Sequence, residues 1–426
     1  MAVAHKNLWE ESAVAAPACP ALAQSTRSDV AIIGAGYLGL SAALHVALGG
    51  ASVVVLDAHQ PGWGASGRNG GQIIPGLKCD PDEIEAIHGG ERGERLSRFA
   101  GATADFVFDL IARHKLAAGA RRSAWVQGVH SRKAAVKARR RADQWRKRGA
   151  DVGYLDAAET AALVGTGIYV GAFIDRRAGS LQPLSYAREL ARVALASGAR
   201  IHGATRAVSM RRADGGWRVV SDGGATVEAE MVLICTNAYS DELVPGLSRS
   251  IIAANSLQVA TEPLPPALRP RLLPHGEVLS DTRKVIRYWR LDDDGRFIMG
   301  GRGPYREPGG ESDWAHLMRD TGALFPMLKD LRFTHRWGGR VAIHRDFMPH
   351  LHAPGPGLLV AIGCQGRGIA WQSAMGAELA RMALDSSHEP LLPLRPIEQI
   401  PLHRLKAVGV SATVALYRAM DRLGWS

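Results

Sequence analysis

Residues 29–58 read DVAIIGAGYLGLSAALHVALGGASVVVLDA and hold the pattern that decides the fold. The apolar run Val30–Ile33 predicts a buried parallel strand, which leads through a glycine-rich turn into a helical pattern at Leu38–Leu48. Two glycines end this helix, and Val53–Leu56 is a second short apolar run. The stretch therefore predicts a βαβ unit.

The turn between the first strand and the helix matches the dinucleotide-binding pattern G-x-G-x-x-G. Gly34 permits a tight turn, Gly36 lets a pyrophosphate approach the backbone, and Gly39 allows the helix to pack closely on the strand. Phosphate oxygens are expected at the helix N-terminus, beside Tyr37 and Leu38, because free N–H groups and the helix dipole favour negative charge there.

Asp57 ends the second strand of the unit. Its carboxylate can accept hydrogen bonds from the ribose hydroxyls of an adenosine, and it disfavours a 2′-phosphate. The βαβ unit thus predicts a bound dinucleotide, without separating FAD from NAD.

The bulk composition is that of a globular protein. Of 426 residues, 46% are hydrophobic and 22% are charged, which is enough for two or more domains. No segment reaches the ~18 uninterrupted apolar residues of a membrane span, and the first 28 residues lack the pattern of a signal peptide. The four cysteines are far apart and show no metal-binding spacing, so we expect a cytoplasmic protein without a metal site.

Much of the net charge of +11 lies in Arg132–Arg148, RKAAVKARRRADQWRKR. Such a run could bind nucleic acid or another anionic surface. Apolar residues interrupt it, however, as in a surface helix with one buried stripe; they are Ala134, Val136, Ala138, Ala142 and Trp145. We expect this helix, and no specific nucleic-acid binding.

Further patterns outline the rest of the chain. Helices are expected at Asp82–His114, Asp156–Val164, Leu184–Ser197 and Leu405–Leu423, and strands at Ala124–His130, Ile201–Met210, Trp217–Ser221, Glu230–Cys235 and Asn255–Glu262. Lys284–Gly300 reads as a hairpin around Asp292–Gly295, and the residues from Gly357 again read as strand, glycine loop and helix.

The glycine loops at both ends of the chain, with hairpins between them, predict an α/β fold that is α+β overall. A Rossmann-like nucleotide domain is expected from the discontinuous segments 29–80, 150–250 and 336–390. An inserted substrate domain with an antiparallel sheet is expected from 81–149 and 251–335. Residues 1–28 would form an N-terminal arm and 391–426 a helical tail.

Directly after the βαβ unit, Gly64–Gln72 reads GASGRNGGQ. With this loop the chain resembles the D-amino-acid oxidase superfamily of FAD-dependent oxidoreductases, and within it the γ-glutamylputrescine oxidase-like proteins. The resemblance implies that the dinucleotide is FAD, with Ser66 and Arg68 at the phosphates and the backbone of Gly70 and Gly71 near the flavin. Gly67, Asn69 and Gln72 belong to the same loop.

The resemblance extends along nearly the whole chain. Gly179–Pro183 is similar to the family's return segment into the nucleotide domain, after which Val208 would lie by the adenine through its backbone. Asn237, in CTNAY, corresponds to a strand end near the flavin, although it could equally be a simple turn former.

The last glycine loop, Gly363–Gly368, would reach the pyrimidine edge of the flavin through Gly363, Gln365, Gly366, Arg367 and Gly368. Relatives carry Ser-Gly-His-Gly in this loop, whereas here Gln365 replaces Ser and Arg367 replaces His. This departure leaves FAD binding intact but puts the transfer of an exact substrate in doubt.

Some relatives attach FAD covalently, through a Cys just ahead of an Asp-x-x-Pro segment or through a His in the first glycine loop. Here the corresponding residues are Gly338–Val341, which contain no Cys, and Arg68. We therefore expect non-covalent FAD.

The activity that the resemblance implies is oxidation of the C–N bond of an amine or amino acid. A hydride passes from the carbon beside an unprotonated nitrogen to the flavin, and water hydrolyses the imine. The electron acceptor would be O2, a quinone or a protein partner. Alternatives are a flavin-containing subunit of a heteromeric dehydrogenase or electron-transfer complex and, less favoured by the Gly64–Gln72 loop, a flavin monooxygenase.

No catalytic residue is predicted, because the flavin carries the difficult step. The candidate substrate liners are Gln72, Tyr288, Arg290 and Trp337. Tyr288 and Arg290 would share one face of a strand, although Tyr288 could simply pack and Arg290 be solvated; Trp337 could stack near the flavin or fill the domain boundary. For His335, His344 and His350 we expect local hydrogen bonds rather than catalysis.

Overall fold

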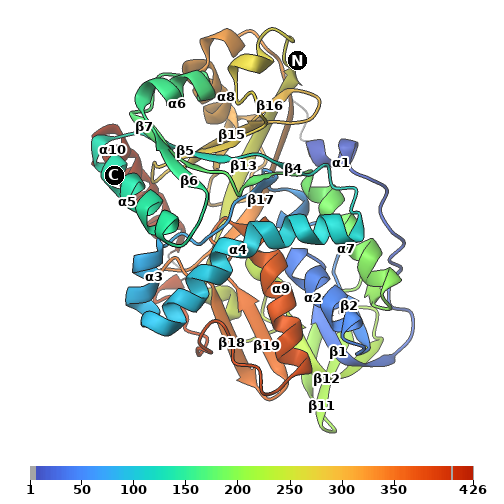
Figure 1. The fold of residues 1–426 in the computed structure, drawn as a ribbon. Coiled ribbons are helices and arrows are strands. Elements are labelled where there is room, and N and C mark those ends of the chain that lie inside the picture. Colours follow the sequence, from blue (N-terminus) through green and yellow to red (C-terminus); the bar gives the residue numbers. More distant parts are fainter. Residues whose placement is uncertain (1–5, 404–405, 426) are drawn as a thin grey trace.

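The protein was analysed as a computed structural model that describes residues 6–403 and 406–425 (Figure 1). The helices are α1 Leu8–Ser12, α2 Tyr37–Leu48, α3 Pro81–His88, α4 Gly90–His114, α5 Arg132–Lys147, α6 Ala157–Val164, α7 Pro183–Ala196, α8 Ala315–Leu324, α9 Gly368–Leu384 and α10 Lys406–Arg422. The strands are β1 Thr26–Ile33, β2 Val53–Leu56, β3 Gln72–Ile73, β4 Arg121–Arg122, β5 Trp125–Val129, β6 Val152–Leu155, β7 Gly171–Asp175, β8 Gly179–Ser180, β9 Arg200–His202, β10 Ala207–Ala213, β11 Gly216–Ser221, β12 Thr226–Ile234, β13 Ile252–Pro263, β14 Val278–Asp281, β15 Arg287–Leu291, β16 Arg296–Arg302, β17 Phe333–Ile343, β18 His350–Gly355 and β19 Leu358–Ile362.

The first sheet is built around the expected βαβ unit. β1 lies between β12 and β2, all three parallel, and β9 and β19 extend the parallel part. Successive residues of β1 alternate between two apolar cores: Ile32 packs with α2, α7 and α9, and Ile33 packs toward the hairpin strands β10 and β11. Both faces of the sheet are thus covered, as a buried parallel strand requires.

The second sheet has the order β17-β13-β16-β15-β14-β5-β7-β6, and its strand pairs are antiparallel except for β14 with β5. It forms the upper half of the molecule in Figure 1, with α6 and α8 beyond it and α5 beside it. Trp289 and Phe297 lie in its apolar core. The α/β fold with an antiparallel insertion, expected from the sequence, is confirmed.

The boundary between the two sheets differs from the expected one. The segment expected to begin the second part of the nucleotide domain at residue 150 first supplies β6 and β7 to the antiparallel sheet, and only β9 and later strands join the parallel one. β7 pairs with β5 on one side and β6 on the other, and all of its residues are buried. These backbone pairings, which a local sequence pattern does not show, place β6 and β7 in the second sheet.

Two local expectations are also corrected. Ile201–Met210 is two strands, because β9 pairs with β2 and β10 with β11 after a bend. The N-terminal arm contains a short helix, α1, which buries Trp9. The tail is helical, although the expected start at Leu405 lies outside the described residues.

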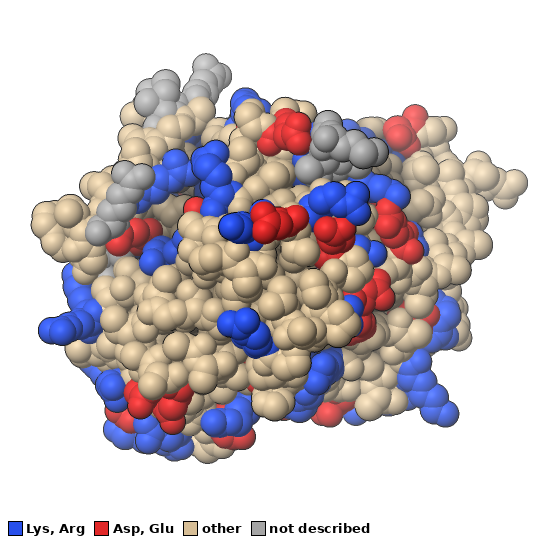
Figure 2. Space-filling model, turned by 90° about the horizontal axis from the view of Figure 1, so that it is seen from above, with Lys and Arg blue, Asp and Glu red and all other residues tan. Residues whose placement is uncertain are grey.

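The basic run does form a surface helix, α5, with one buried stripe. Val136, however, is 62% exposed, and Arg141 and Gln144 are buried in its place beside Ala138 and Trp145. Figure 2 shows one face of the molecule, on which basic and acidic side chains are intermingled. No helix of the described segments has the length and apolar character of a membrane span.

Replacing Gly39 with Ala is expected to destabilise the protein by about 1–3 kcal/mol, because overpacking costs this much in a rigid core. A Cβ atom on Gly39 would overlap the carbonyl oxygen of Gly34. Urea unfolding checks the prediction. Gly223→Ala is the matched control, since a Cβ there meets nothing closer than 3.9 Å; equal midpoints for the two variants would contradict it.

Candidate functional site

A large cavity lies between the two sheets. Its volume is about 1840 Å³, well above the ~300–1,000 Å³ of a pocket for one small ligand. One wall comes from the glycine loops of the first sheet and the other from strands β5 and β13–β16, while α10 closes one side with Val410, Val414 and Tyr417. The space can hold a cofactor and a substrate together.

The first glycine loop has the geometry of a phosphate site. Gly34 has a φ of +108°, and a Cβ there would lie 2.9 Å from the carbonyl oxygen of Cys235, so a side chain would not fit. The N-cap residue of α2, Gly36, has no side chain, and the N–H of Tyr37 donates to Ser66 Oγ; the helix dipole still favours an anion at this end. Asp57 is held at the end of β2, where its carboxylate accepts hydrogen bonds from the N–H groups of Ala35 (2.6 Å) and His59 (2.8 Å).

Asn69 organises the second loop, Gly64–Gln72, from inside. Its Nδ2 donates to Tyr37 Oη (3.0 Å) and to the carbonyl oxygen of Ser66 (2.9 Å), and its Oδ1 accepts from the N–H of Gly71 (2.8 Å). Ser66 Oγ in turn accepts from the N–H of Tyr37 (3.0 Å). The loop is therefore tied to the start of α2.

The same loop is held from outside by side chains from distant parts of the chain. Trp337 Nε1 donates to the carbonyl oxygen of Arg68 (3.1 Å), and Trp9 Nε1 donates to that of Asn69 (2.8 Å). Arg290 Nε donates to the carbonyl oxygen of Gly70 (2.8 Å). Each of three consecutive carbonyl oxygens thus accepts a hydrogen bond from a buried side chain.

This arrangement corrects the expectation for Arg290 and Trp337. Both are buried and neither lines the cavity. The remaining Arg290 nitrogens donate to the carbonyl oxygens of Leu181 (2.9 Å) and Leu291 (3.2 Å). A Cβ on Gly71 would overlap this guanidinium. Arg290 is therefore neither solvated nor a substrate liner but a support beneath the loop, and Trp337 fills the domain boundary.

Tyr288 and Gln72 do line the cavity. Tyr288 lies on the same strand face as Arg290, whereas Trp289 points into the apolar core, as alternation predicts. Tyr288 Oη is 2.8 Å from Ser256 Oγ, and burial raises the pKa of Tyr288 to about 12, so the phenol stays protonated. Gln72 Nε2 donates to the carbonyl oxygens of Leu279 (3.1 Å) and Trp289 (3.3 Å).

Asn237 joins the end of β12 to the last glycine loop. Its Oδ1 accepts from the N–H of Gly363 (3.0 Å), and its Nδ2 lies 3.4 Å from Cys364 Sγ. Its φ of +47° is typical of a turn. Asn237 therefore forms a turn and also connects the end of β12 to the glycine loop. Gln365 also has a positive φ, of +50°, and its Nε2 donates to the carbonyl oxygen of Met348 (3.0 Å).

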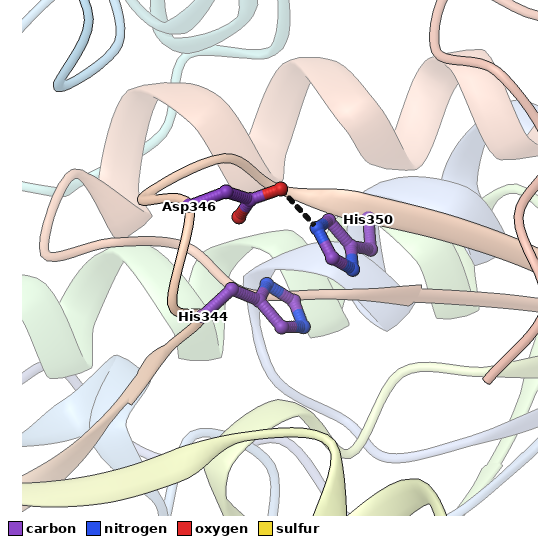
Figure 3. A group of neighbouring side chains, drawn as sticks. All are labelled: His344, Asp346 and His350. Carbon is purple, nitrogen blue, oxygen red and sulfur yellow. Dashed lines mark hydrogen bonds and ion pairs between the residues drawn. The ribbon is translucent and has the colours of Figure 1, made fainter. Parts of the chain in front are cut away.

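His344, Asp346 and His350 cluster behind this loop (Figure 3). His350 Nε2 and Asp346 Oδ2 are 2.9 Å apart, and hydrogen bonds from His350 and Met348 hold the pKa of Asp346 well below its usual range against the effect of burial. The two imidazoles stack at 3.7 Å with an 11° interplanar angle. Their lone pairs therefore run parallel rather than toward a common ion.

The histidines in this segment have the local hydrogen bonds that were expected. His344 Nδ1 lies 2.9 Å from the carbonyl oxygen of Met348, and burial, with the neighbouring His350, lowers the pKa of His344 to about 4. His335 Nε2 lies 3.1 Å from Glu11. The cluster thus supports the turn that holds Gln365.

The structure brings most of the expected site residues to one cavity. Those that line it are Tyr37, Ser66, Arg68, Asn69, Gly70, Gln72, Asn237, Gln365, Gly366, Arg367 and Gly368. Those outside its lining are Gly34, Gly36, Leu38, Gly39, Asp57, Gly67, Gly71, Val208 and Gly363. Val208 is half-exposed, at the point where the register between β10 and β11 shifts.

Some residues of the site carry no recognisable sequence signal. Trp9 lies on the unexpected helix α1, and Gln258 of β13 donates through Nε2 to the carbonyl oxygen of Arg68. Lys78, which follows the Gly64–Gln72 loop in the sequence, also lines the cavity. Only Lys78 could have been suspected, as a lone lysine close behind a cofactor loop.

The residues present fit an FAD molecule. The turn at Gly34, where a side chain would not fit, the N-terminus of α2 and Asp57 suit a pyrophosphate and a ribose. Arg68 supplies a cation that has no acidic partner in the described structure. Gly70 and Gly366, from two different loops, both line the cavity, where a flavin ring would lie.

Comparison with known proteins agrees with this geometry. Residues 29–382 match the family model described as FAD dependent oxidoreductase, DAO. The chain is 32% identical over 388 residues to a probable oxidoreductase OrdL of Rhizobium meliloti, covering 89% of both chains. It is 27% identical over 407 residues to the gamma-glutamylputrescine oxidoreductase of Escherichia coli, covering 95% of both.

Among solved structures, glycine oxidase from Geobacillus kaustophilus superposes with a TM-score of 0.72 at 21% identity, covering 88% of this chain and 99% of that one. This likeness shows the shared fold. Together with the family match, it leads to one conclusion: the chain belongs to the DAO family of FAD-dependent oxidoreductases.

Proposed function

We propose that this enzyme oxidises the C–N bond of an amine or amino acid. The observation that carries the proposal is the cavity, in which Gln72 at the end of one glycine loop faces a polar wall of the second sheet formed by Gln127, Ser256 and Tyr288. The relatives named above include a gamma-glutamylputrescine oxidoreductase and a glycine oxidase, which act on such C–N bonds. Bound FAD supplies the hydride acceptor.

The chain's own residues orient the substrate and set its protonation. Hydride loss requires an unprotonated nitrogen, and the cationic side chains Lys78 and Arg367 in the cavity favour the neutral form of an amine. Tyr288 remains a neutral phenol at physiological pH and can position the substrate by hydrogen bonding. The second sheet and α10 would cover one side of a bound substrate.

For the cofactor we propose roles that follow the geometry. The start of α2, with Ser66 and Arg68, would hold the pyrophosphate, and Asp57 the adenosine ribose. The backbone at Val208 would contact the adenine, because the register shift there leaves it out of the regular strand ladder. The N-terminus of α9, a helix with no side-chain cap, would face the flavin and stabilise negative charge on it.

Anaerobic mixing of the FAD-loaded enzyme with a panel of amines, N-methyl amino acids and D-amino acids tests the function. At least one compound is expected to bleach the flavin absorbance near 450 nm, because reduction needs no electron acceptor. Bleaching by the isolated chain would also exclude a purely structural subunit. No bleaching by any member of the panel would contradict the proposal.

The FAD is expected to be non-covalent. After acid precipitation the yellow colour should stay in the supernatant, because Gly338–Val341 carries no cysteine and Arg68 stands where relatives have an attaching His. A yellow pellet would overturn this and would point to Cys79 or Cys364, both of which line the cavity.

Arg290→Met is expected to weaken FAD binding by about tenfold or more, since hydrogen bonds from a charged donor contribute ~1.5–3 kcal/mol and the loop carbonyls would lose theirs. Titration of the apoprotein with FAD checks this. Arg319→Met, at an exposed position of α8, is the control. A raised KM for amines with unchanged FAD affinity would instead restore Arg290 as a substrate liner.

A further inference from the structure

The C-terminal helix α10 is apolar on two opposite faces. The face turned toward the protein closes the cavity with Val410, Val414 and Tyr417. The outer face carries exposed side chains that recur at the spacing of one helix face and are all apolar: Ala412, Leu416, Ala419 and Leu423. Trp425, just beyond the helix, is 62% exposed. Because the outer face of a surface helix is normally polar, this one indicates a contact with an apolar partner.

The basic helix α5 lies beside α10 (Figure 1). Lys133 Nζ, at the start of α5, donates to the carbonyl oxygen of Trp425 (3.0 Å). A Cβ on Gly424 would lie 3.9 Å from the Cβ of Ser131, the N-cap residue of α5. Side chains of both helices also line the cavity. The start of α5 and the end of α10 are therefore neighbours on one side of the cavity.

The exposed side of α5 is basic. Arg132, Arg140 and Lys147 are exposed, and none of them forms an ion pair with a described residue. Val136, in the same stretch, is exposed as well. The acidic residue of this helix, Asp143, pairs within the helix at 2.9 Å. Exposed apolar groups on α10 beside unpaired cations on α5 are complementary to a partner that is both apolar and anionic.

We propose that α10 and α5 together dock this enzyme on the surface of an anionic membrane. The outer face of α10, with Trp425, would enter the boundary between headgroups and acyl chains to a depth of about 5–10 Å. The basic side chains of α5 would bind the lipid phosphate groups. Because both helices also line the cavity, docking would place the cavity beside the membrane surface. The docking does not depend on which reaction the enzyme catalyses.

Two other partners fit this surface less well. A second copy of the chain would bring two basic α5 helices together, with a net charge of +11 on each chain. A stable protein interface also takes about 20–30 residues from each partner, far more than the outer face of α10 offers. A nucleic acid would engage the cations and leave the apolar face of α10 in water. An anionic lipid surface uses both helices.

Co-sedimentation of the FAD-loaded enzyme with lipid vesicles tests the proposal. The wild type should bind vesicles of phosphatidylglycerol and phosphatidylcholine in equal parts far better than phosphatidylcholine alone, and salt should weaken this binding. The double variant Leu416→Ser, Leu423→Ser should bind about tenfold or more weakly, because the inserted apolar groups are lost. Leu48→Ser, at the end of α2, is the matched control, since Leu48 is 56% exposed and Leu416 and Leu423 are each 58% exposed.

The charges of α5 are tested separately. A triple variant should bind the anionic vesicles about a hundredfold more weakly, because each basic residue near an anionic surface contributes about a factor of five; its substitutions are Arg132→Gln, Arg140→Gln and Lys147→Gln. A control with the same loss of charge at exposed positions outside both helices should lose less than fivefold; its substitutions are Arg113→Gln, Arg211→Gln and Lys329→Gln. Unchanged flavin absorbance of the purified variants shows that they are folded.

Insertion of α10 has its own readout. Brominated lipids in the anionic vesicles should quench part of the tryptophan fluorescence of the wild type, because Trp425 would lie among the acyl chains. This quenching should be absent in Trp425→Phe.

A wild-type enzyme that does not bind anionic vesicles would overturn the proposal. So would binding that is lost in the Gln variant of α5 but unchanged in the Ser variant of α10, since the contact would then be one of charge alone. A wild-type dimer that the Ser variant converts to a monomer, with no vesicle binding by either, would assign the outer face of α10 to a second copy. None of these measurements needs turnover, so they stand apart from the test of the proposed function.

Discussion

The loop Gly64–Gln72 is fixed by hydrogen-bond donors from three separate parts of the chain. The carbonyl oxygens of three consecutive loop residues accept hydrogen bonds from the indole groups of Trp9 and Trp337 and from the guanidinium of Arg290. Trp9 and Trp337 also pack edge to face at 5.7 Å, and Arg290 lies 5.1 Å from the Trp9 ring. The N-terminal arm, the hairpin and β17 thereby meet at the loop, so the two domains and the cofactor site form one unit.

These hydrogen bonds explain how a large cavity can have a lining of fixed conformation. A glycine-rich loop loses much conformational entropy when it is ordered, and here buried charged and aromatic donors offset that cost. The loop would then present its backbone, Ser66 and Arg68 to the cofactor, while Tyr288 and Gln72 line the rest of the cavity. The cationic lining of the cavity, in turn, suits an electron-rich reduced cofactor.

Sequence reasoning worked where the signal is local. The βαβ unit, the hairpin at Asp292–Gly295 and the helix after Gly368 follow from periodicity and glycine placement, and each is present. Alternation also placed Tyr288 and Arg290 on one strand face. It could not show that Arg290 serves the loop, because its acceptors, Gly70 and Leu181, are distant in the chain.

The other features that the sequence did not reveal also depend on contacts between residues that are distant in the chain. Residues 150–178 join the second sheet through backbone pairing with β5, which leaves no mark on side-chain pattern. Lys78 lies close behind the Gly64–Gln72 loop in the sequence, but that Arg367, from the far end of the chain, lies against Pro75 beside it is seen only in the structure. Non-local contacts of this kind cannot be read from composition or spacing.

The central claim is that separated segments close around one FAD molecule. Hydrogen–deuterium exchange of the apoprotein with and without FAD tests it most directly. The account predicts protection on FAD addition at residues 34–39, 66–72, 207–209 and 363–368 together. Protection confined to 34–39, with the other segments unchanged, would contradict it.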